Sequence, residues 1–123
     1  MADILIIEDH EPVRSVLEEI LRDEHHEVRA ASDGETGLTL ARERCPDLVF
    51  LDLKMPGVGG SEVLRVLKED PETRRAKVVI VTAGAEAERE EILALGAEDY
   101  FTKPFSPLAI LDLVERLTGE TPG

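Results

Sequence analysis

The chain has 123 residues, which is enough for one domain with a core of its own. Its 27 acidic and 14 basic residues give a formal net charge of −13, and so acidic a surface argues against direct nucleic-acid binding. No apolar run approaches the roughly 18 residues of a membrane span, and the N-terminus does not resemble a secretory signal. The single Cys45 cannot form an internal disulfide, so we expect a cytoplasmic protein without membrane contact.

Strands and helices are predicted to alternate along the chain, beginning with the continuous apolar run Ile4-Leu5-Ile6-Ile7. Each predicted strand is followed by apolar residues at the spacing of one helix face. We expect strands at residues 4–7, 27–31, 47–51, 77–81 and 99–102. We expect helices at about 12–22, 32–45, 60–69, 85–95 and 106–118. Five such units predict one parallel sheet with helices on both faces.

Several predicted helix ends carry residues that favour a boundary. Ser32 and Glu35 lie at capping-box spacing at the start of the second helix. Ser106 followed by Pro107 predicts the start of the last helix. Gly96 is expected to end the fourth helix, whose apolar stripe is thin. A thin stripe suits a mobile element that few contacts hold in place.

Polar residues follow four of the five predicted strands. Glu8-Asp9 comes after the first strand, Asp52 after the third, Thr82 after the fourth and Lys103 after the fifth. The carboxyl ends of parallel strands meet at one edge of the sheet, where open α/β sheets bind their ligands. We therefore expect three carboxylates, a hydroxyl and an ammonium to converge at that edge.

The carboxylates of this set indicate a site for a hard divalent cation. Glu8, Asp9 and Asp52 would repel one another, and a dication relieves that repulsion. Mg²⁺ suits such oxygen ligands, whereas zinc is disfavoured because no His or Cys lies at a matching strand end. If all three are ionised against Lys103, the metal-free site carries a charge of about −2, so Mg²⁺ should stabilise the fold.

A metal beside a carboxylate and a lysine is also an arrangement for phosphoryl transfer. The two cations balance charge on the transferring oxygens, and the carboxylate can attack phosphorus. Taken singly, Asp52 could be a solvated strand end, Lys103 a surface charge, Thr82 a helix cap and Tyr100 a half-buried ring on an edge strand. Their coincidence in one crevice favours a functional site.

These residues stand in short motifs that together resemble the receiver domain of two-component response regulators, from Asp3 to about Thr118. In chain order the motifs are Glu8-Asp9, Asp52-Leu53-Lys54-Met55-Pro56 with Gly60, Thr82-Ala83, and Tyr100-Phe101-Thr102-Lys103-Pro104-Phe105. The resemblance implies an α/β, flavodoxin-like (βα)5 three-layer sandwich with strand order 2-1-3-4-5. It also implies a receiver domain over residues 1–118, followed by a short tail or a linker stub at 119–123.

By this resemblance, Asp52 is the phosphoacceptor and takes its phosphoryl group from a sensor histidine kinase or a histidine phosphotransfer protein. Mg²⁺ would be bound directly by Asp9 and Asp52, through water by Glu8, and by the backbone carbonyl of Lys54. Such a protein catalyses its own phosphorylation and dephosphorylation, and it is not an enzyme that turns over an outside substrate.

Other residues are expected to bind the phosphoryl group or to respond to it. By the resemblance, Lys103, Thr82 and Ala83 contact the phosphoryl oxygens, and the bond between Lys103 and Pro104 is cis. Thr82 and Tyr100 form the switch pair: the hydroxyl moves toward the phosphoryl group, and the ring turns inward into the space left behind. The fourth helix, fifth strand and fifth helix would then present the output surface to a downstream protein.

Phosphate lifetime, oligomeric state and domain context stay open from the sequence. Lys54 and Gly84 occupy variable positions that flank the phosphoryl group and tune how fast water attacks it. We expect an unphosphorylated monomer and leave dimerisation on phosphorylation open. The chain ends soon after its last predicted helix, so we expect no effector domain here. A stand-alone receiver is slightly favoured over a longer protein cut near Gly119.

Three other classes of protein compete with this interpretation. A magnesium-dependent aspartyl-phosphate phosphatase commonly has a second acid two residues after its nucleophile, where this chain has Lys54. A flavin-binding electron carrier of the same fold would need a phosphate loop after the first strand, where the acidic Glu8-Asp9 pair would repel the phosphate. A receiver-like scaffold that takes no phosphate is disfavoured by the complete residue set but stays open.

Overall fold

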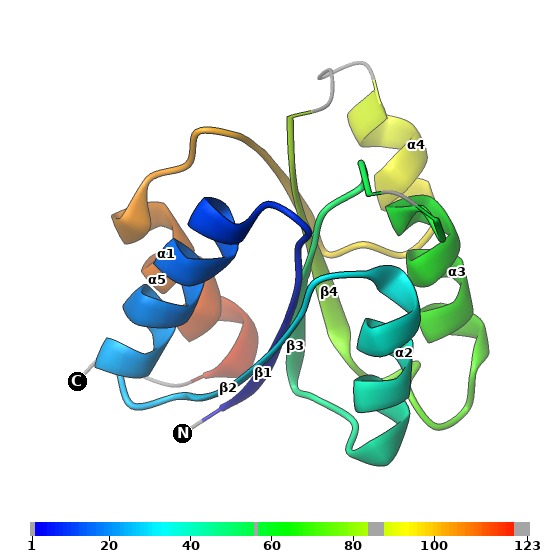
Figure 1. The fold of residues 1–123 in the computed structure, drawn as a ribbon, viewed down its shortest axis with the longest axis horizontal. Coiled ribbons are helices and arrows are strands. Elements are labelled where there is room, and N and C mark those ends of the chain that lie inside the picture. Colours follow the sequence, from blue (N-terminus) through cyan, green and yellow to red (C-terminus); the bar gives the residue numbers. More distant parts are fainter. Residues whose placement is uncertain (1, 56, 84–87, 120–123) are drawn as a thin grey trace.

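The computed structural model describes residues 2–55, 57–83 and 88–119, which form one sheet between two layers of helices (Figure 1). The strands are β1 (Asp3–Ile7), β2 (Glu27–Ala31), β3 (Leu48–Leu51), β4 (Lys77–Thr82) and β5 (Asp99–Thr102). The helices are α1 (Glu11–Asp23), α2 (Gly34–Glu43), α3 (Gly60–Glu69), α4 (Arg89–Ala94) and α5 (Pro107–Thr118). The strand order is β2-β1-β3-β4-β5 with every pair parallel, so the predicted fold is confirmed.

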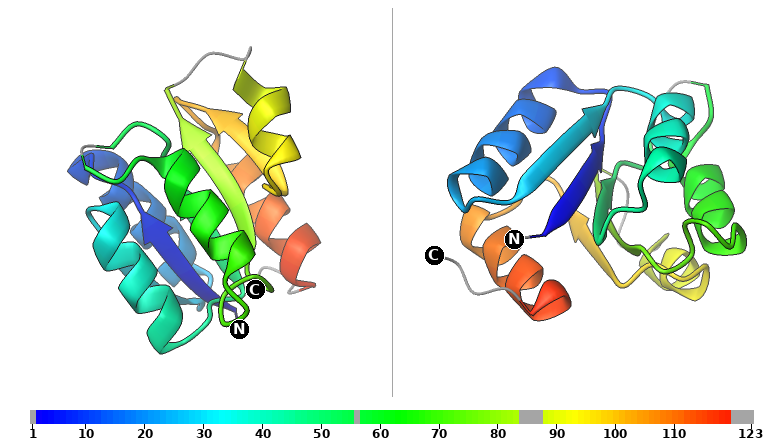
Figure 2. Two further views of the ribbon diagram at one scale, coloured as in Figure 1. Left: turned by 90° about the vertical axis from the view of Figure 1, so that its right-hand side faces the viewer. Right: turned by 90° about the horizontal axis from the view of Figure 1, so that it is seen from below.

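Alternate residues of the strands enter two separate cores, one on each face of the sheet. On β1, Ile4 and Ile6 pack on the face covered by α1 and α5, whereas Leu5 and Ile7 pack on the face covered by α2, α3 and α4. Figure 2 shows the two helix layers against the sheet. All four side chains are fully buried, and burial of each contributes about 1.5–3 kcal/mol. Burial on both faces explains why the strand is a continuous apolar run.

One predicted helix cap is wrong. Helix α2 is capped by Asp33, and not by a capping box between Ser32 and Glu35. The carboxylate of Asp33 accepts hydrogen bonds from the amide of Thr36 (2.8 Å) and from its hydroxyl (3.0 Å). One side chain thus satisfies two donors of the first turn, and the helix begins at Gly34.

The other helix ends agree more closely with the sequence. Ser106 accepts a hydrogen bond from the amide of Ala109 (3.4 Å) and starts α5 as predicted. Helix α2 ends at Glu43, slightly earlier than expected, because Arg44 is already extended. After α4, Gly96 has a φ of 113°, a conformation that favours glycine.

Some sequence predictions fall outside the described residues. They concern Pro56, Gly84, the expected start of the fourth helix at residues 85–87, and the end of the tail at 120–123. Helix α4 is described from Arg89 onward, with Glu88 as its N-cap residue. Within the described part of the chain, no helix is both long and apolar enough to cross a membrane.

Candidate functional site

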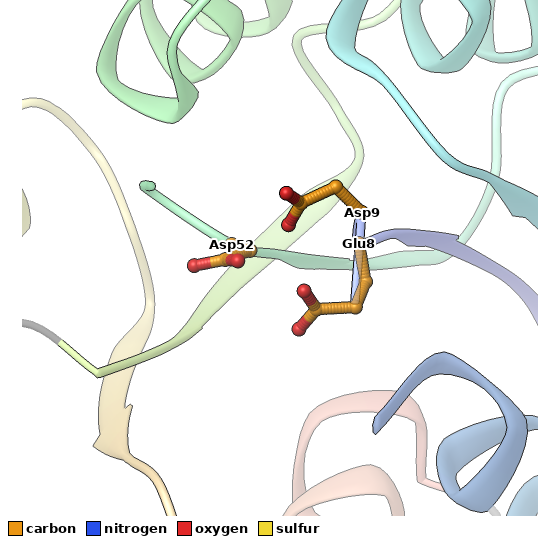
Figure 3. A group of neighbouring side chains, drawn as sticks. All are labelled: Glu8, Asp9 and Asp52. Carbon is orange, nitrogen blue, oxygen red and sulfur yellow. The ribbon is translucent and has the colours of Figure 1, made fainter. Parts of the chain in front are cut away.

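Three carboxylates gather at the carboxyl edge of the sheet (Figure 3). Glu8 and Asp9 directly follow β1, and Asp52 directly follows the neighbouring strand β3. The ladder between the two strands continues to this point, because the amide of Asp52 donates to the carbonyl of Ile7 (3.0 Å). One oxygen from each of the three carboxylates lies within 4.8 Å of the others. Glu8 and Asp52 are only 2% and 4% exposed, whereas Asp9 faces solvent.

The ammonium of Lys103 balances part of this charge. Lys103 follows β5, and its Nζ lies 2.7 Å from Glu8 Oε1 and 3.4 Å from Asp52 Oδ2. Its amide donates to the carbonyl of Thr82 (2.8 Å), and its peptide bond to Pro104 is cis. The lysine predicted from the fifth strand end therefore reaches both buried carboxylates, and it lies closer to Glu8 than to Asp52.

Glu8 is held close to its titration point at neutral pH. Burial and, to a lesser extent, a hydrogen bond with Asp52 raise the pKa of Glu8 to about 7, although Lys103 and the amide of His10 oppose the change. Burial would lower the pKa of Lys103, but the hydrogen bond to Glu8 and the charges of both carboxylates raise it. A proton on Glu8 makes the metal-free site less negative than the charge of about −2 expected from full ionisation.

The loop after β3 is fitted closely to Asp52. The amide of Lys54 donates to Asp52 Oδ1 (3.1 Å), and the amide of Gly60 donates to the carbonyl of Leu53 (3.1 Å). A Cβ on Gly60 would overlap with the backbone of Asp52 and Leu53, so only glycine fits where α3 begins. The backbone of Lys54 is thereby fixed beside the carboxylate.

The donor set fits Mg²⁺. Hard carboxylate oxygens converge here from the ends of two strands, and the carboxylate of Asp9 is exposed. Such a site suits a cation that keeps several of its waters. A buried pair such as Glu8 and Asp52 is stable only with a proton or a cation nearby. The cluster found among the described residues contains no His or Cys, so the chemistry of zinc does not suit it.

The two residues predicted as a switch pair both lie inside the protein. Thr82 is the last residue of β4 and is fully buried. Tyr100 is 1% exposed and belongs to the core beneath α3 and α4, so it is not the half-buried edge ring considered from the sequence. Its carbonyl accepts a hydrogen bond from Arg89 of α4 (2.7 Å), whose guanidinium lies 6.0 Å from the ring centre. The ring therefore occupies an inward position in this structure.

An apolar groove opens beside Lys103. It has a volume of about 630 Å³ and runs between α1 and the segment that joins β5 to α5. Ala83 and Lys103 lie at its site end. Its other lining residues are His10, Pro12, Val13, Val16, Pro104, Phe105 and Pro107. A partner docked in this groove would lie next to the acceptor site.

Sequence reasoning missed one residue of the site. Arg14 of α1 donates a hydrogen bond to the carbonyl of Glu8 (3.0 Å) and so fixes the backbone that carries the first two carboxylates. A helical side chain that turns back to the end of the preceding strand leaves no motif. A basic residue one turn into the helix after an acidic strand end is the only signal that could have indicated it.

The chain belongs to the family of response regulator receiver domains, whose model matches residues 4–115. Response regulator PleD of Caulobacter vibrioides is 41% identical over 118 residues, which are 95% of this chain and 26% of PleD. The phosphate regulon transcriptional regulatory protein PhoB of Rhizobium meliloti is 39% identical over 115 residues, 93% of this chain and 51% of PhoB. The chain thus spans about a quarter to a half of the length of these curated relatives.

Solved structures of receiver domains share the fold closely. The receiver domain of sensor histidine kinase PA1611 from Pseudomonas aeruginosa has a TM-score of 0.88 at 28% identity, over 97% of this chain and 98% of that one. That structure is described with a magnesium ion coordinated in its active-site cleft. Chemotaxis protein CheY4 of Vibrio cholerae has a TM-score of 0.88 at 26% identity, over 95% of this chain and 98% of its own.

Proposed function

We propose that this receiver domain is a phosphorylatable switch and that Asp52 is its phosphoacceptor. The observation that carries the proposal is the placement of Asp52, whose nearly buried carboxylate shares a site with the ammonium of Lys103 and two further carboxylates. A buried nucleophile flanked by a cation and by metal ligands is the arrangement that phosphoryl transfer requires.

Transfer begins at the carboxylate of Asp52. One of its oxygens attacks the phosphorus of a phosphohistidine on a sensor histidine kinase or a histidine phosphotransfer protein. The bond between phosphorus and the donor's nitrogen breaks, and its electron pair stays on that nitrogen. Mg²⁺ bound by Asp9 and Asp52, by Glu8 through water and by the carbonyl of Lys54 would supply positive charge at the transferring oxygens. Lys103 holds one phosphoryl oxygen.

The response to phosphorylation passes from Thr82 and Ala83 to Tyr100. Thr82 and Ala83 bind the phosphoryl oxygens at the end of β4. The movement of Thr82 toward the phosphoryl group changes the packing of Tyr100, which lies on the neighbouring strand β5. Arg89 already joins α4 to the carbonyl of Tyr100. The surface formed by α4, β5 and α5 therefore transmits the change to a downstream protein partner.

The proposal also covers the location, oligomeric state and partners of the protein. The protein is a cytoplasmic phosphorelay component with residues 1–118 as its receiver domain and 119–123 as a short tail or the start of a linker. It makes no direct contact with nucleic acid, and it is a monomer that can dimerise when phosphorylated. It catalyses its own phosphorylation and dephosphorylation and is not a turnover enzyme. The apolar groove beside Lys103 supports a protein phosphodonor, because a docked helix would place its histidine near Asp52.

A receiver-like scaffold that takes no phosphate is the second candidate. The position of Lys103 favours it to a degree, since the ammonium lies nearer to Glu8 than to Asp52. An aspartyl-phosphate phosphatase is less favoured, because Lys54 stands where the second acid would be required.

Intact-mass spectrometry after incubation with acetyl phosphate and Mg²⁺ separates these candidates. The parent chain should gain the mass of one phosphoryl group, and Asp52→Ala should gain none. EDTA should abolish the adduct in the parent. A folded chain that binds Mg²⁺ but gains no mass, and that also fails to bind beryllofluoride, would be the scaffold.

A further inference from the structure

Lys54 contributes its backbone to the site at Asp52, but its ammonium has no role there in the resting chain. The amide of Lys54 donates to Asp52 Oδ1 (3.1 Å), so this residue is anchored at the acceptor carboxylate. Its ammonium lies 3.9 Å from Oε1 of Glu88, the N-cap residue of α4. The side chain of Lys54 therefore ties the loop after β3 to the start of the helix that belongs to the proposed output surface.

This ion pair is weak enough to exchange partners. The side chains of Lys54 and Glu88 are 59% and 43% exposed, and their charged atoms are at the outer limit of an ion pair. Exposed pairs of this kind contribute about 0–1 kcal/mol, because water and salt screen them. The stem of a lysine has four flexible carbons, so the ammonium can leave Glu88 and swing toward its own backbone anchor.

Phosphorylation of Asp52 would create a stronger partner for the ammonium. A phosphoryl group carries a charge of about −2 and three strong acceptor oxygens. Asp52 is almost fully buried, so charge placed on it is screened less than the charge on Glu88. Lys54 is already held at this carboxylate by its amide, and the exchange needs only a rotation of its side chain.

We propose that Lys54 exchanges Glu88 for the phosphoryl group on Asp52, and that Glu88 thereby controls both the lifetime of the phosphate and the attachment of α4. This inference rests on the proposed phosphorylation of Asp52. In the resting chain Glu88 holds the ammonium away from the site. After phosphorylation Lys54 binds a phosphoryl oxygen, and the start of α4 loses its tie to the loop after β3.

The exchange slows hydrolysis of the acyl phosphate. In hydrolysis water attacks phosphorus, the bond to the oxygen of Asp52 breaks, and a carboxylate and inorganic phosphate are released. Lys103 and Mg²⁺ would already supply positive charge at the phosphoryl oxygens, so the effect of Lys54 is on the access of water. With its ammonium on a phosphoryl oxygen, the side chain of Lys54 lies across the phosphoryl group and obstructs the attacking water. Lys54 lengthens the lifetime, and Glu88 shortens it by competing for Lys54.

The half-life of the acyl phosphate in Mg²⁺, followed by intact mass after removal of acetyl phosphate, tests this exchange. Lys54→Met should shorten the half-life by roughly threefold, and Glu88→Gln should lengthen it by about twofold, in keeping with a weak pair. The double variant should behave as Lys54→Met, because Glu88 acts only through Lys54. Lys54→Arg, which keeps the charge, should restore most of the lifetime. Glu91→Gln removes a carboxylate from the same helix and should change nothing.

Hydrogen exchange of α4 gives an independent readout. Beryllofluoride with Mg²⁺ should speed amide exchange in the peptide that contains residues 89–94 of the parent. In Glu88→Gln the exchange should already be faster than in the parent without beryllofluoride, by about twofold to fivefold, because the weak tie to Lys54 is absent. Glu91→Gln should exchange like the parent.

Three results would overturn the inference. The first is a parent half-life in Lys54→Met. The second is a longer half-life when Glu88→Gln is added to Lys54→Met. The third is an unchanged rate of hydrogen exchange of α4 in Glu88→Gln. If phosphoryl groups form on Asp52 with such unchanged lifetimes, this inference fails alone. If no chain takes a phosphoryl group, the proposed function fails together with it.

Discussion

At the carboxyl edge of the sheet, the ammonium of Lys103 lies beside a cluster of three carboxylates. This excess of negative charge affects the protonation of Glu8 and the affinity of the site for a cation. Lys103 is closer to Glu8 than to Asp52, and burial gives Glu8 a pKa of about 7. A proton on Glu8 therefore reduces the repulsion among the carboxylates, as a bound metal ion would. Mg²⁺ would displace that proton and leave Lys103 free to hold a phosphoryl oxygen.

Removal of one charge should stabilise the metal-free chain. At about pH 8.5, where Glu8 is ionised, we expect Asp52→Asn to raise the free energy of unfolding in EDTA by about 1 kcal/mol, since it relieves the repulsion between Asp52 and Glu8 and leaves the pair of Glu8 and Lys103 in place. Urea unfolding measures the change, with the exposed Asp112→Asn on α5 as a matched control. A clear loss of stability in Asp52→Asn, together with a parent melting temperature that does not change with Mg²⁺, would rule out repulsion among the clustered carboxylates.

The proton on Glu8 predicts a pH dependence of stability. Because the pKa is raised from 4.5 to about 7 on folding, the native state binds more protons than the unfolded state between these values. Its contribution to stability is full below pH 4.5 and is lost as pH rises through about 7. In EDTA the parent should therefore lose about 2 kcal/mol relative to Glu8→Gln between pH 5 and pH 7.5.

The measurement compares urea midpoints of the two chains at both pH values. Saturating Mg²⁺ should remove most of the difference, because the metal ion replaces the proton. Parallel pH profiles for the parent and Glu8→Gln in EDTA would show that Glu8 titrates normally.

At the level of secondary structure, the loops at the strand ends are what hold the site in shape. The loop after β3 is pinned at both ends: the amide of Lys54 binds the side chain of Asp52, and Gly60 packs against its backbone. The apolar strands hold the ends of these loops in register, and Ile7 and Leu51 are paired just before the carboxylates.

Substitution of Gly60 should disturb the site more than substitution of its neighbour. Gly60→Ala places a Cβ into the backbone of Asp52 and Leu53, so we expect a loss of about 1–3 kcal/mol and weaker Mg²⁺ binding. Gly59→Ala is the matched control, because a Cβ at Gly59 meets nothing within 4 Å and its φ is −72°. Urea unfolding and a Mg²⁺ titration measure both effects. Equal behaviour of the two variants would contradict the close packing at Gly60.

Two substitutions distinguish Asp33 from Ser32 as the residue that caps α2. Asp33→Ala should lower the free energy of unfolding, because it removes the acceptor for the amide of Thr36. Ser32→Ala should lower it much less, since Ser32 lies outside the helix. The free energy of unfolding of the two variants decides between them, and the reverse order would restore the capping box that the sequence suggested.

Across the whole molecule, the sequence predicted the sheet and the residues that line its edge. Fully buried strands such as β1 and β3 are continuous apolar runs, so their ends, and with them Glu8, Asp9 and Asp52, could be located. Alternation with helices then implied a parallel sheet that brings these ends together. The motifs supplied the strand order.

Features that depend on distances between elements could not be read from the sequence. The unequal sharing of Lys103, the proton on Glu8 and the contact of Arg14 with the carbonyl of Glu8 all arise from burial and side-chain direction in the folded chain. The pair of Lys54 and Glu88 joins the loop after β3 to the start of α4, which is far from it in sequence. The cap of α2 was mistaken because Ser32 and Asp33 both favour a helix start, and only the backbone conformation distinguishes them.

The central claim is that Asp52, among 27 acidic residues, is the one that carries the phosphoryl group. Borohydride reduces an acyl phosphate to the corresponding alcohol, which marks the acceptor permanently. After treatment with acetyl phosphate and Mg²⁺, reduction and peptide mass spectrometry, we predict that residue 52 alone is converted, and that EDTA prevents the conversion. Conversion at Asp9 or at another carboxylate, or none at all in a chain that has gained the phosphoryl mass, would contradict the account.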